Sequence, residues 1–374
     1  MRTILITGSD GFVGRNLRAE LHRRQDLRLL CFDVQDDPAV LEDLLDQADF
    51  VFHLAGVNRP QQVEEFDTGN KGLTERICGH LTRTSKKMPL VISSSTQAAF
   101  DNPYGISKRA AEQAVIAYGR ETGGAAYVFR LPNVFGKWCR PNYNSAVATF
   151  CHNIARDLPI QVNDQEAVLN LVYIDDVVKT FLLLLEGEQE LEDGFSVVKP
   201  VHSVKLGDMV NLIMSFRASR DARNVPDLSD DFTKKLYSTY LSYLPEDRFS
   251  YPLMMNIDER GSFTEFIKTP DRGQVSINIS KPGITKGNHW HHTKNEKFLV
   301  VSGEGIIRFR KIGTNEVIAY PVSGRKLEVV DIPPGYTHNI TNTGSTDMVT
   351  VMWCNELFNP ENSDTYFEHV ELAE

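Results

Sequence analysis

The chain begins with a short apolar run that ends in three evenly spaced glycines. Residues 3–7 are rich in β-branched side chains, as in a buried strand, and Gly8, Gly11 and Gly14 follow. A helical pattern of apolar residues continues from there. A glycine turn between strand and helix lets the backbone approach a pyrophosphate, which the free N–H groups of the helix N-terminus can bind. The spacing is Gly-x-x-Gly-x-x-Gly, and it predicts a dinucleotide-binding fold.

Further apolar runs alternate with helical patterns after this turn. Strands are expected at residues 28–32, 51–56 and 90–92, and this alternation indicates a doubly wound parallel sheet. The first of these strands, residues 28–32, ends at Asp33. A carboxylate there can bind the adenosine ribose hydroxyls and would repel a 2′-phosphate, which favours NADH. The simpler alternative is that Asp33 is a turn residue.

Tyr104 and Lys108 are four residues apart, so a helix would place them on one face. An ammonium group beside a phenol lowers the phenol pKa, so Tyr104 could exchange a proton with a carbonyl oxygen. Ser95 could bond the same oxygen. Ser94 is the alternative, because only nine residues separate Ser95 from Tyr104. A surface pair without chemistry is the other interpretation of an isolated Tyr-x-x-x-Lys.

Together with the glycine turn, these residues resemble the extended short-chain dehydrogenase/reductase family over residues 1–245. The resemblance implies NADPH or NADH as cofactor, a nucleotide-sugar substrate, and catalysis by Tyr104, Lys108 and Ser95. The cofactor-binding residues that it implies are Gly8, Gly11, Phe12, Val13, Gly14, Asp33, Leu54, Ala55, Gly56 and Asn70. Its substrate-binding candidates lie in a stretch that could hold a diphosphate or be a polar surface loop: Asn133, Arg140 and Asn144.

A second group of residues suggests a metal site. His289 and His291 are two residues apart, so on a strand both would point to the same face. Glu296 follows before the next apolar run, and His338 lies downstream. Three nitrogens and one oxygen suit one borderline divalent metal, zinc first, with nickel or iron as alternatives. Packed polar residues without a metal are the other interpretation.

The pattern changes after the proline-broken stretch at residues 244–248. Short apolar runs there alternate with turn signals, which indicates an antiparallel barrel. The expected strands are residues 275–279, 306–310, 326–331 and 348–353. The residues at fixed spacings resemble the two cupin motifs, although Leu327 stands where a glycine is expected: Gly283, His289, His291, Glu296, Gly303, Pro333, Gly335, His338 and Asn342. We therefore expect a Rossmann-type α/β domain at 1–245 and an all-β cupin barrel at 246–374.

Composition narrows the range of partners. The 374 residues carry a formal net charge of -10, which gives no basic field for nucleic acid. No apolar run reaches the length of a membrane span, and the N-terminal one is too short for a signal peptide. The five cysteines are scattered without a CxxC pair and suggest reduced thiols. We expect a cytoplasmic protein without nucleic-acid or membrane partners.

A reductase followed by a cupin resembles the bifunctional capsular polysaccharide synthesis enzymes, which are homodimers. The resemblance implies that the cupin epimerises a UDP-4-keto-6-deoxy-HexNAc at C3. The reductase would then reduce the C4 ketone, giving a UDP-N-acetyl-6-deoxy-L-talosamine type sugar. The base for epimerisation stays open among His292, Lys297 and Tyr336. Two alternatives remain: an active reductase with the cupin as a metal-stabilised dimerisation scaffold, or a non-catalytic nucleotide-sugar or redox-sensing binding protein.

Overall fold

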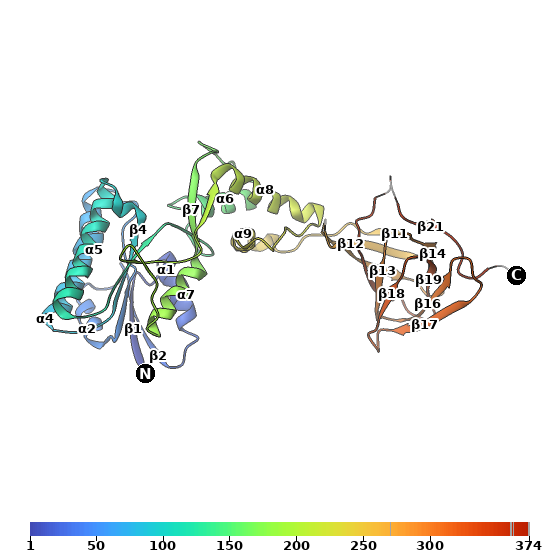
Figure 1. Cartoon of the computed structure of the whole chain (residues 1–374), viewed down its shortest axis with the longest axis horizontal. Coiled ribbons are helices and arrows are strands. Elements are labelled where there is room, and N and C mark those ends of the chain that lie inside the picture. Colours follow the sequence, from blue (N-terminus) through green and yellow to red (C-terminus); the bar gives the residue numbers. More distant parts are fainter. Residues whose placement is uncertain (270, 360, 362, 373–374) are drawn as a thin grey trace. The chain divides into compact units, whose positions relative to one another are not determined.

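The computed structural model describes residues 1–269, 271–359, 361 and 363–372, and the chain forms two compact units (Figure 1). The first comprises Met1–Ser215 and Leu228–Glu246, and the second comprises Phe216–Asp227 and Asp247–Glu374. Segment 216–227 joins the second unit through backbone pairing, since Lys268 N–H donates to Arg223 O and Val225 N–H donates to Lys268 O. The division therefore differs from a single boundary at residue 245.

The first unit is built on a mainly parallel seven-stranded sheet with the order β2-β1-β3-β4-β5-β9-β8. Its strands are β1 (Arg2–Thr7), β2 (Leu27–Phe32), β3 (Phe50–His53), β4 (Leu90–Ser95), β5 (Ala126–Leu131), β8 (Leu191–Glu192) and β9 (Phe195–Ser196). The three predicted strands after the glycine turn correspond to β2, β3 and β4. The order reverses between β1 and β3, and ligands of such sheets bind at this point, beyond the carboxyl ends of the strands.

Helices cover both faces of this sheet (Figure 1), as the alternation within β1 requires. Ile4 and Ile6 belong to the core that contains Leu17 of α1 and Phe181 of α7, whereas Leu5 belongs to the core on the other face. The helices of that other core are α2, α4 and α5. The bounds are α1 (Phe12–Leu21), α2 (Val40–Gln47), α4 (Leu73–Arg83), α5 (Pro103–Thr122) and α7 (Ile174–Leu185). This is the doubly wound α/β fold that the sequence predicts.

Shorter elements complete the first unit. A three-stranded sheet contains β6 (Asn133–Phe135), β7 (Val168–Tyr173) and β10 (His202–Lys205). The remaining helices are α3 (Glu64–Phe66), the π-helix η1 (Asp67–Gly72), the 3-10 helix η2 (Thr96–Ala99), α6 (Ala146–Ala155), α8 (Leu206–Ala222), which continues into the second unit, and α9 (Asp231–Leu241). Within the described residues, no helix is both long and apolar enough to cross a membrane.

The second unit contains two antiparallel sheets. The six-stranded sheet has the order β11-β12-β13-β20-β15-β18, and the five-stranded sheet has the order β17-β16-β19-β14-β21. Their bounds are β11 (Asn256–Asp258), β12 (Gly261–Thr269), β13 (Gly273–Ser280), β14 (Thr285–Trp290), β15 (Glu296–Ser302), β16 (Glu304–Lys311), β17 (Val317–Ser323), β18 (Val329–Ile332), β19 (Tyr336–Asn342), β20 (Met348–Cys354) and β21 (Tyr366–Phe367). The 3-10 helix η3 (Glu246–Arg248) lies just before them.

Both sheets contribute to one apolar core, which includes Phe298 and Val300 of β15 and Ile307 and Phe309 of β16. The all-β prediction is confirmed, but the described strands form two sheets rather than a closed barrel, because β17 and β18 are edge strands. Two packed antiparallel sheets are the jelly-roll arrangement found in cupins. The predicted strand at residues 326–331 begins three residues later than expected, as β18.

Candidate active-site cleft and candidate metal centre

A cleft of about 1040 Å³ lies at the carboxyl ends of β1, β3 and β4. Most of the residues predicted for the reductase site line it: Gly8, Gly11, Phe12, Val13, Gly14, Leu54, Gly56, Ser95, Tyr104, Lys108, Asn133, Arg140 and Asn144. The other lining residues include Asn58, Trp138, Tyr143 and Tyr243, which the sequence did not single out. Residues from separate parts of the sequence thus form one continuous surface.

The start of the cleft is a tight turn that requires glycine. Gly8 has φ +69°, and a Cβ atom on it would lie 2.6 Å from the backbone nitrogen of Ala55. The turn leads into α1, whose N-cap residue Gly11 has no side chain to bond the first N–H groups. Because these donors face the cleft without a cap, the turn fits the pyrophosphate of a dinucleotide.

Asp33 follows β2 but does not line the cleft. One of its carboxylate oxygens accepts a hydrogen bond from Asp10 N–H at 2.7 Å, and the other accepts from Val34 N–H at 2.8 Å. Each oxygen keeps a lone pair, so a ribose hydroxyl still fits.

Asn70, also expected at the cofactor, is buried behind the cleft wall. It accepts a hydrogen bond from Val57 N–H and donates to Ser107 Oγ. This geometry gives Asn70 a supporting position rather than a place on the cleft wall.

Helix α5 sets the position of Tyr104. The Asn102 side chain caps this helix by accepting from Gly105 N–H at 2.8 Å, and Pro103 occupies the first turn. Gly105 allows the close approach of η2, because a Cβ atom there would lie 2.3 Å from Gln97 O. Tyr104 therefore lies in the first turn of α5, where its hydroxyl donates to Asn58 Oδ1 at 2.8 Å.

Lys108 lies one turn further along α5, with its Nζ 6.0 Å from the centre of the Tyr104 ring. The ammonium group donates to Ser93 O at 3.0 Å and is buried. Burial lowers the pKa of Lys108 to about 8. Burial also raises the pKa of Tyr104, and a hydrogen bond with Ser95 opposes this shift only in part. The predicted lowering of the phenol pKa is therefore wrong for this structure, because desolvation outweighs the hydrogen bond with Ser95.

The two candidate serines at the end of β4 have different partners. Ser94 is buried and donates to Glu112 Oε1 at 2.5 Å. Glu112 also forms a two-point ion pair with Arg130, at 3.0 Å from Nε to Oε1 and 2.7 Å from Nη2 to Oε2. Ser95 lines the cleft beside Tyr104, and its Oγ accepts from Gln97 N–H. Since the Ser94 hydroxyl is bonded to a buried carboxylate, Ser95 is the serine with a hydroxyl available to a ligand.

The far wall of the cleft comes from the segment after β6. The Arg140 guanidinium lies 5.2 Å from the centre of the Tyr143 ring, and Asn133 and Asn144 line the same wall. Tyr243 fastens this segment, because its hydroxyl donates to Cys139 O at 2.5 Å. The wall combines a cation, amides and aromatic rings, which suits the diphosphate and the nucleobase of a nucleotide.

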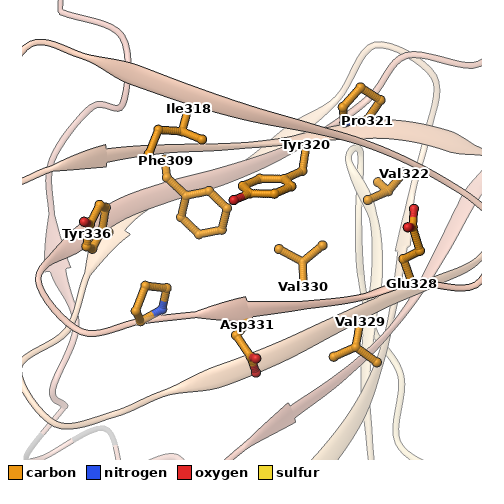
Figure 2. A pocket seen from close by; sticks show the side chains of 11 residues that line it. Phe309, Ile318, Tyr320, Pro321, Val322, Glu328, Val329, Val330, Asp331 and Tyr336 are labelled. Carbon is orange, nitrogen blue, oxygen red and sulfur yellow. The ribbon is translucent and has the colours of Figure 1, made fainter.

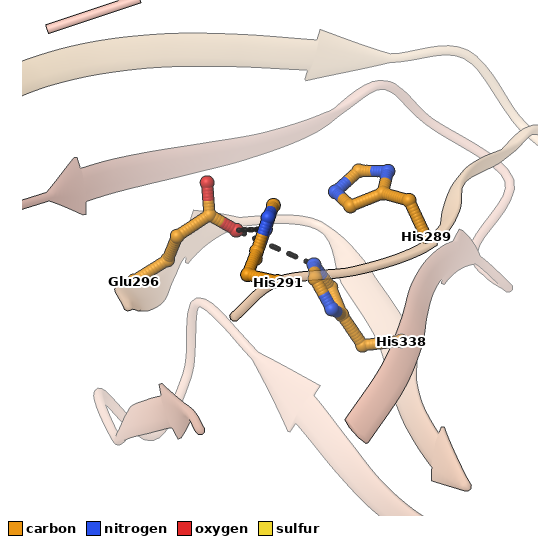
Figure 3. Close-up of side chains that lie close together, drawn as sticks. All are labelled: His289, His291, Glu296 and His338. Atoms are coloured by element: carbon orange, nitrogen blue, oxygen red, sulfur yellow. Dashed lines mark ion pairs between the residues drawn. The ribbon is translucent and has the colours of Figure 1, made fainter. Parts of the chain in front are cut away.

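The second unit brings together the four predicted metal ligands: His289 on β14, His291 just beyond it, Glu296 on β15 and His338 on β19 (Figure 3). Their donor atoms lie within 4.8 Å of one another. Glu296 Oε2 is 3.5 Å from His291 Nε2 and 3.3 Å from His338 Nε2. These three atoms are buried without a hydrogen-bond partner.

Such orphaned polar atoms are costly unless something fills the gap between them. Burial, followed by the nearby His338, lowers the pKa of His289 to about 3 and keeps its ring neutral. Burial works against ionisation of Glu296, yet the close contacts with His291 and His338 and the charge of Lys294 lower its pKa. Neutral imidazoles and an ionised carboxylate are the forms that bind a divalent metal, so the residues fit one.

A separate cavity of about 660 Å³ lies between the edge strands β17 and β18 of the second unit, and it opens to solvent at the exposed side chains of Ile318, Tyr320 and Val329 (Figure 2). Aromatic and aliphatic side chains dominate its wall, including Phe309, Tyr320, Val330 and Tyr336. Tyr336 precedes His338 by two residues on β19, so the two side chains share a face. Phe309 is the β16 partner of His338 in the strand register, which links the cavity to the histidine cluster.

The other two candidates for the epimerisation base lie outside this cavity. Lys297 forms an ion pair with Asp331 on the opposite face of β15 from Glu296. His292 is exposed, and its ring packs against Trp290 and Tyr366.

The fold and the cleft define a nucleotide-sugar oxidoreductase or epimerase of the extended short-chain dehydrogenase/reductase class, followed by a β-domain with a buried His/Glu cluster. Residues 4–197 match the NAD dependent epimerase/dehydratase family, and residues 256–366 match the polysaccharide biosynthesis C-terminal domain.

The chain is 48% identical to the UDP-2-acetamido-2,6-beta-L-arabino-hexul-4-ose reductase of Pseudomonas aeruginosa, over 97% of each chain. It is 57% identical to the crystal structure of the capsular polysaccharide assembling protein CapF from Staphylococcus aureus, with a TM-score of 0.93 over 98% of this chain and 100% of that one. A UDP-glucuronic acid 4-epimerase from Bacillus cereus (16% identity, TM-score 0.55, covering 64% of this chain and 98% of that chain) shares the fold. The chain therefore belongs to the NAD dependent epimerase/dehydratase family and, within it, to the CapF proteins.

Proposed function

We propose that this chain is a two-step enzyme acting on a UDP-4-keto-6-deoxy-HexNAc. The second unit epimerises the sugar at C3, and the first reduces the C4 ketone with NADPH or NADH. The product is a UDP-N-acetyl-6-deoxy-L-talosamine type sugar, used for capsular or surface polysaccharide. The observation that carries the proposal is the presence of two separate and complete residue sets in one chain. The name of the Pseudomonas relative, a reductase of a UDP-linked hexul-4-ose, supports the choice of substrate.

For the reduction, the cleft residues have distinct tasks. Gly8, Gly11 and the N-terminus of α1 bind the pyrophosphate of the cofactor, which supplies a hydride to C4 when bound. Tyr104 gives its hydroxyl proton to the ketone oxygen, so the C=O bond becomes C–OH and the electron count balances. Ser95 bonds the same oxygen. The Tyr104 hydroxyl donates to Asn58 Oδ1. During the reduction the ketone oxygen of the substrate takes the place of this amide oxygen as the acceptor.

For the epimerisation, His289, His291, Glu296 and His338 hold one divalent metal, with zinc as the first choice. A bound metal would polarise the C4 ketone and so acidify the neighbouring C3–H. Tyr336 is our candidate for the group that moves the C3 proton, because it alone of the three residues considered lines the cavity between β17 and β18. The proposal includes a homodimer in the cytoplasm.

The experiment uses Tyr104→Phe in deuterated water with a UDP-4-keto-6-deoxy-HexNAc and NADPH. We expect NADPH oxidation to fall by about 10²–10⁴-fold, the usual contribution of a general acid, while NMR still shows deuterium entering at C3. His338→Ala should give the reverse result. Deuterium exchange at C3 should be lost, while the reductase cleft of the first unit should still reduce a ketone that is already epimerised.

Tyr127→Phe is the matched control, because that ring stacks on Phe50 in the core away from the cleft. Unchanged oxidation in Tyr104→Phe would refute its role. If wild-type protein reduces the ketone without deuterium exchange at C3, the epimerisation step is refuted. The chain would then be a reductase whose second unit serves as a scaffold.

A further inference from the structure

The turn that joins two of the metal-ligand candidates, His291 and Glu296, is held by a residue near the end of the chain. Three consecutive N–H groups of this turn point at the carboxylate of Asp364. His292 N donates to Oδ1 at 2.9 Å, while Thr293 N and Lys294 N donate to Oδ2 at 2.7 and 2.9 Å. The Thr293 hydroxyl adds a fourth bond at 3.0 Å. One side chain therefore accepts from three of the four N–H groups between His291 and Glu296, and the fourth, that of Asn295, donates to Asn355 Oδ1 at 3.0 Å.

The main chain of the same residue fixes the His291 ring. His291 Nδ1 is 2.5 Å from Asp364 O. A carbonyl oxygen can only accept, so Nδ1 carries the proton and Nε2 keeps a free lone pair. That lone pair belongs to one of the buried, unpartnered atoms that face Glu296. Asp364 thus sets both the tautomer of His291 and the path of the chain to Glu296.

The segment around Asp364 is itself anchored. Strand β21 pairs with β14 directly beside the site, with Phe367 opposite His289. Arg310, a buried side chain, donates to the carbonyls of Val370 and His369 and to Glu368 Oε1 at 2.7–3.0 Å. These contacts make the C-terminal segment a fixed part of the domain, so Asp364 has a rigid support.

We infer that Asp364 is a positioning residue of the metal centre, and that the C-terminal segment 363–370 is needed to hold His291 and Glu296 at the separation that the metal requires. The inference rests on the metal site in the proposed function. Groups that orient metal ligands typically change metal affinity by about 10–100-fold when they are removed. A change of this size in metal affinity is what a positioning role predicts, whereas a purely structural role would change the melting temperature without changing metal affinity.

The test compares Asp364→Ala and Asp364→Asn with wild type in the full-length chain. Zinc affinity is measured by competition with a chromophoric chelator, and the visible spectrum of the Co²⁺ form reports coordination geometry. We expect Asp364→Ala to bind zinc about 10–100-fold more weakly, with an altered Co²⁺ spectrum. Asp364→Asn should fall between it and wild type, because its amide oxygen can accept on one side only.

Glu361→Ala is the matched control, since it removes an exposed carboxylate three residues away. Zinc affinity within about twofold of wild type in both Asp364 variants would overturn the inference, whatever their melting temperatures. If Asp364→Ala does not fold, the Asp364→Asn affinity and Co²⁺ spectrum decide the question alone. A wild-type protein that binds no zinc would refute the metal centre itself, which distinguishes failure of the proposed function from failure of this inference.

Discussion

Adjacent serines at the end of β4 should respond to the same substitution in opposite ways. Ser94→Ala removes a 2.5 Å hydrogen bond to the buried carboxylate of Glu112 and leaves Arg130 as its remaining partner. A hydrogen bond to a charged group contributes about 1.5–3 kcal/mol. At about 2–4 °C per kcal/mol for a domain of this size, the melting temperature should fall by about 3–12 °C. NADPH oxidation at 25 °C should change little, since Ser94 Oγ is turned away from the ligand.

Ser95→Ala should do the reverse. Its hydroxyl faces the cleft and bonds Gln97 N–H at 3.2 Å in an exposed position rather than bonding a buried charge, so little stability is lost. Removing a hydrogen-bond donor to the ketone oxygen should lower kcat by about 10²–10³-fold. The assays are thermal denaturation and steady-state NADPH oxidation with the same UDP-4-keto sugar for both variants. A stable, inactive Ser94→Ala together with an unstable, active Ser95→Ala would refute the assignment of the two serines.

Three further predictions concern buried polar and charged groups. Burial lowers the pKa of Lys108 from 10.5 to about 8, so the folded chain binds this proton less tightly than the unfolded chain. The buried charge therefore lowers the free energy of unfolding by at most about 3 kcal/mol below pH 8, and this loss disappears as the pH rises toward 10.5. Lys108→Met should abolish reduction yet melt above wild type at pH 7, with the gap closing by pH 10, and a lower melting temperature at pH 7 would contradict this. Arg130→Met should destabilise the protein by about 3 kcal/mol because it leaves Glu112 buried and unpaired, and denaturant titration should show that replacing Glu112 by Met as well recovers most of the loss. His338→Ala should reduce zinc content measured by elemental analysis, and dialysis against a chelator should lower the melting temperature of wild type but not of this variant.

Local patterns in the sequence were enough to predict much of the molecule. The glycine turn and the apolar strands are determined by neighbours in the chain, so β1 to β4 and the two-sided packing followed from periodicity. The spacing of His289 and His291 on a strand likewise placed both near Glu296. The features that the sequence missed depend on contacts between distant segments. Asn58 lies in a loop without a pattern, and Asp364 is more than 70 residues from the ring that it orients.

The same distinction explains the two corrections. The pKa of Tyr104 follows from how deeply the cleft buries it, which no spacing along α5 reveals. The open edge between β17 and β18 depends on which strands pair, and alternation of apolar residues is the same in a closed barrel and in two sheets. Pairing between distant strands is therefore what a single sequence leaves undetermined.

The edge position of β21 has a consequence for biosynthesis. Its partner β14 is made some 75 residues earlier, yet β14 has no neighbour on that side until Tyr366 and Phe367 are available. A chain synthesised only as far as β20 therefore lacks this strand, whereas the seven-stranded sheet of the first unit has all its strands by residue 196. Because domains tend to fold as units during synthesis, the first unit can begin to fold while the second still lacks β21.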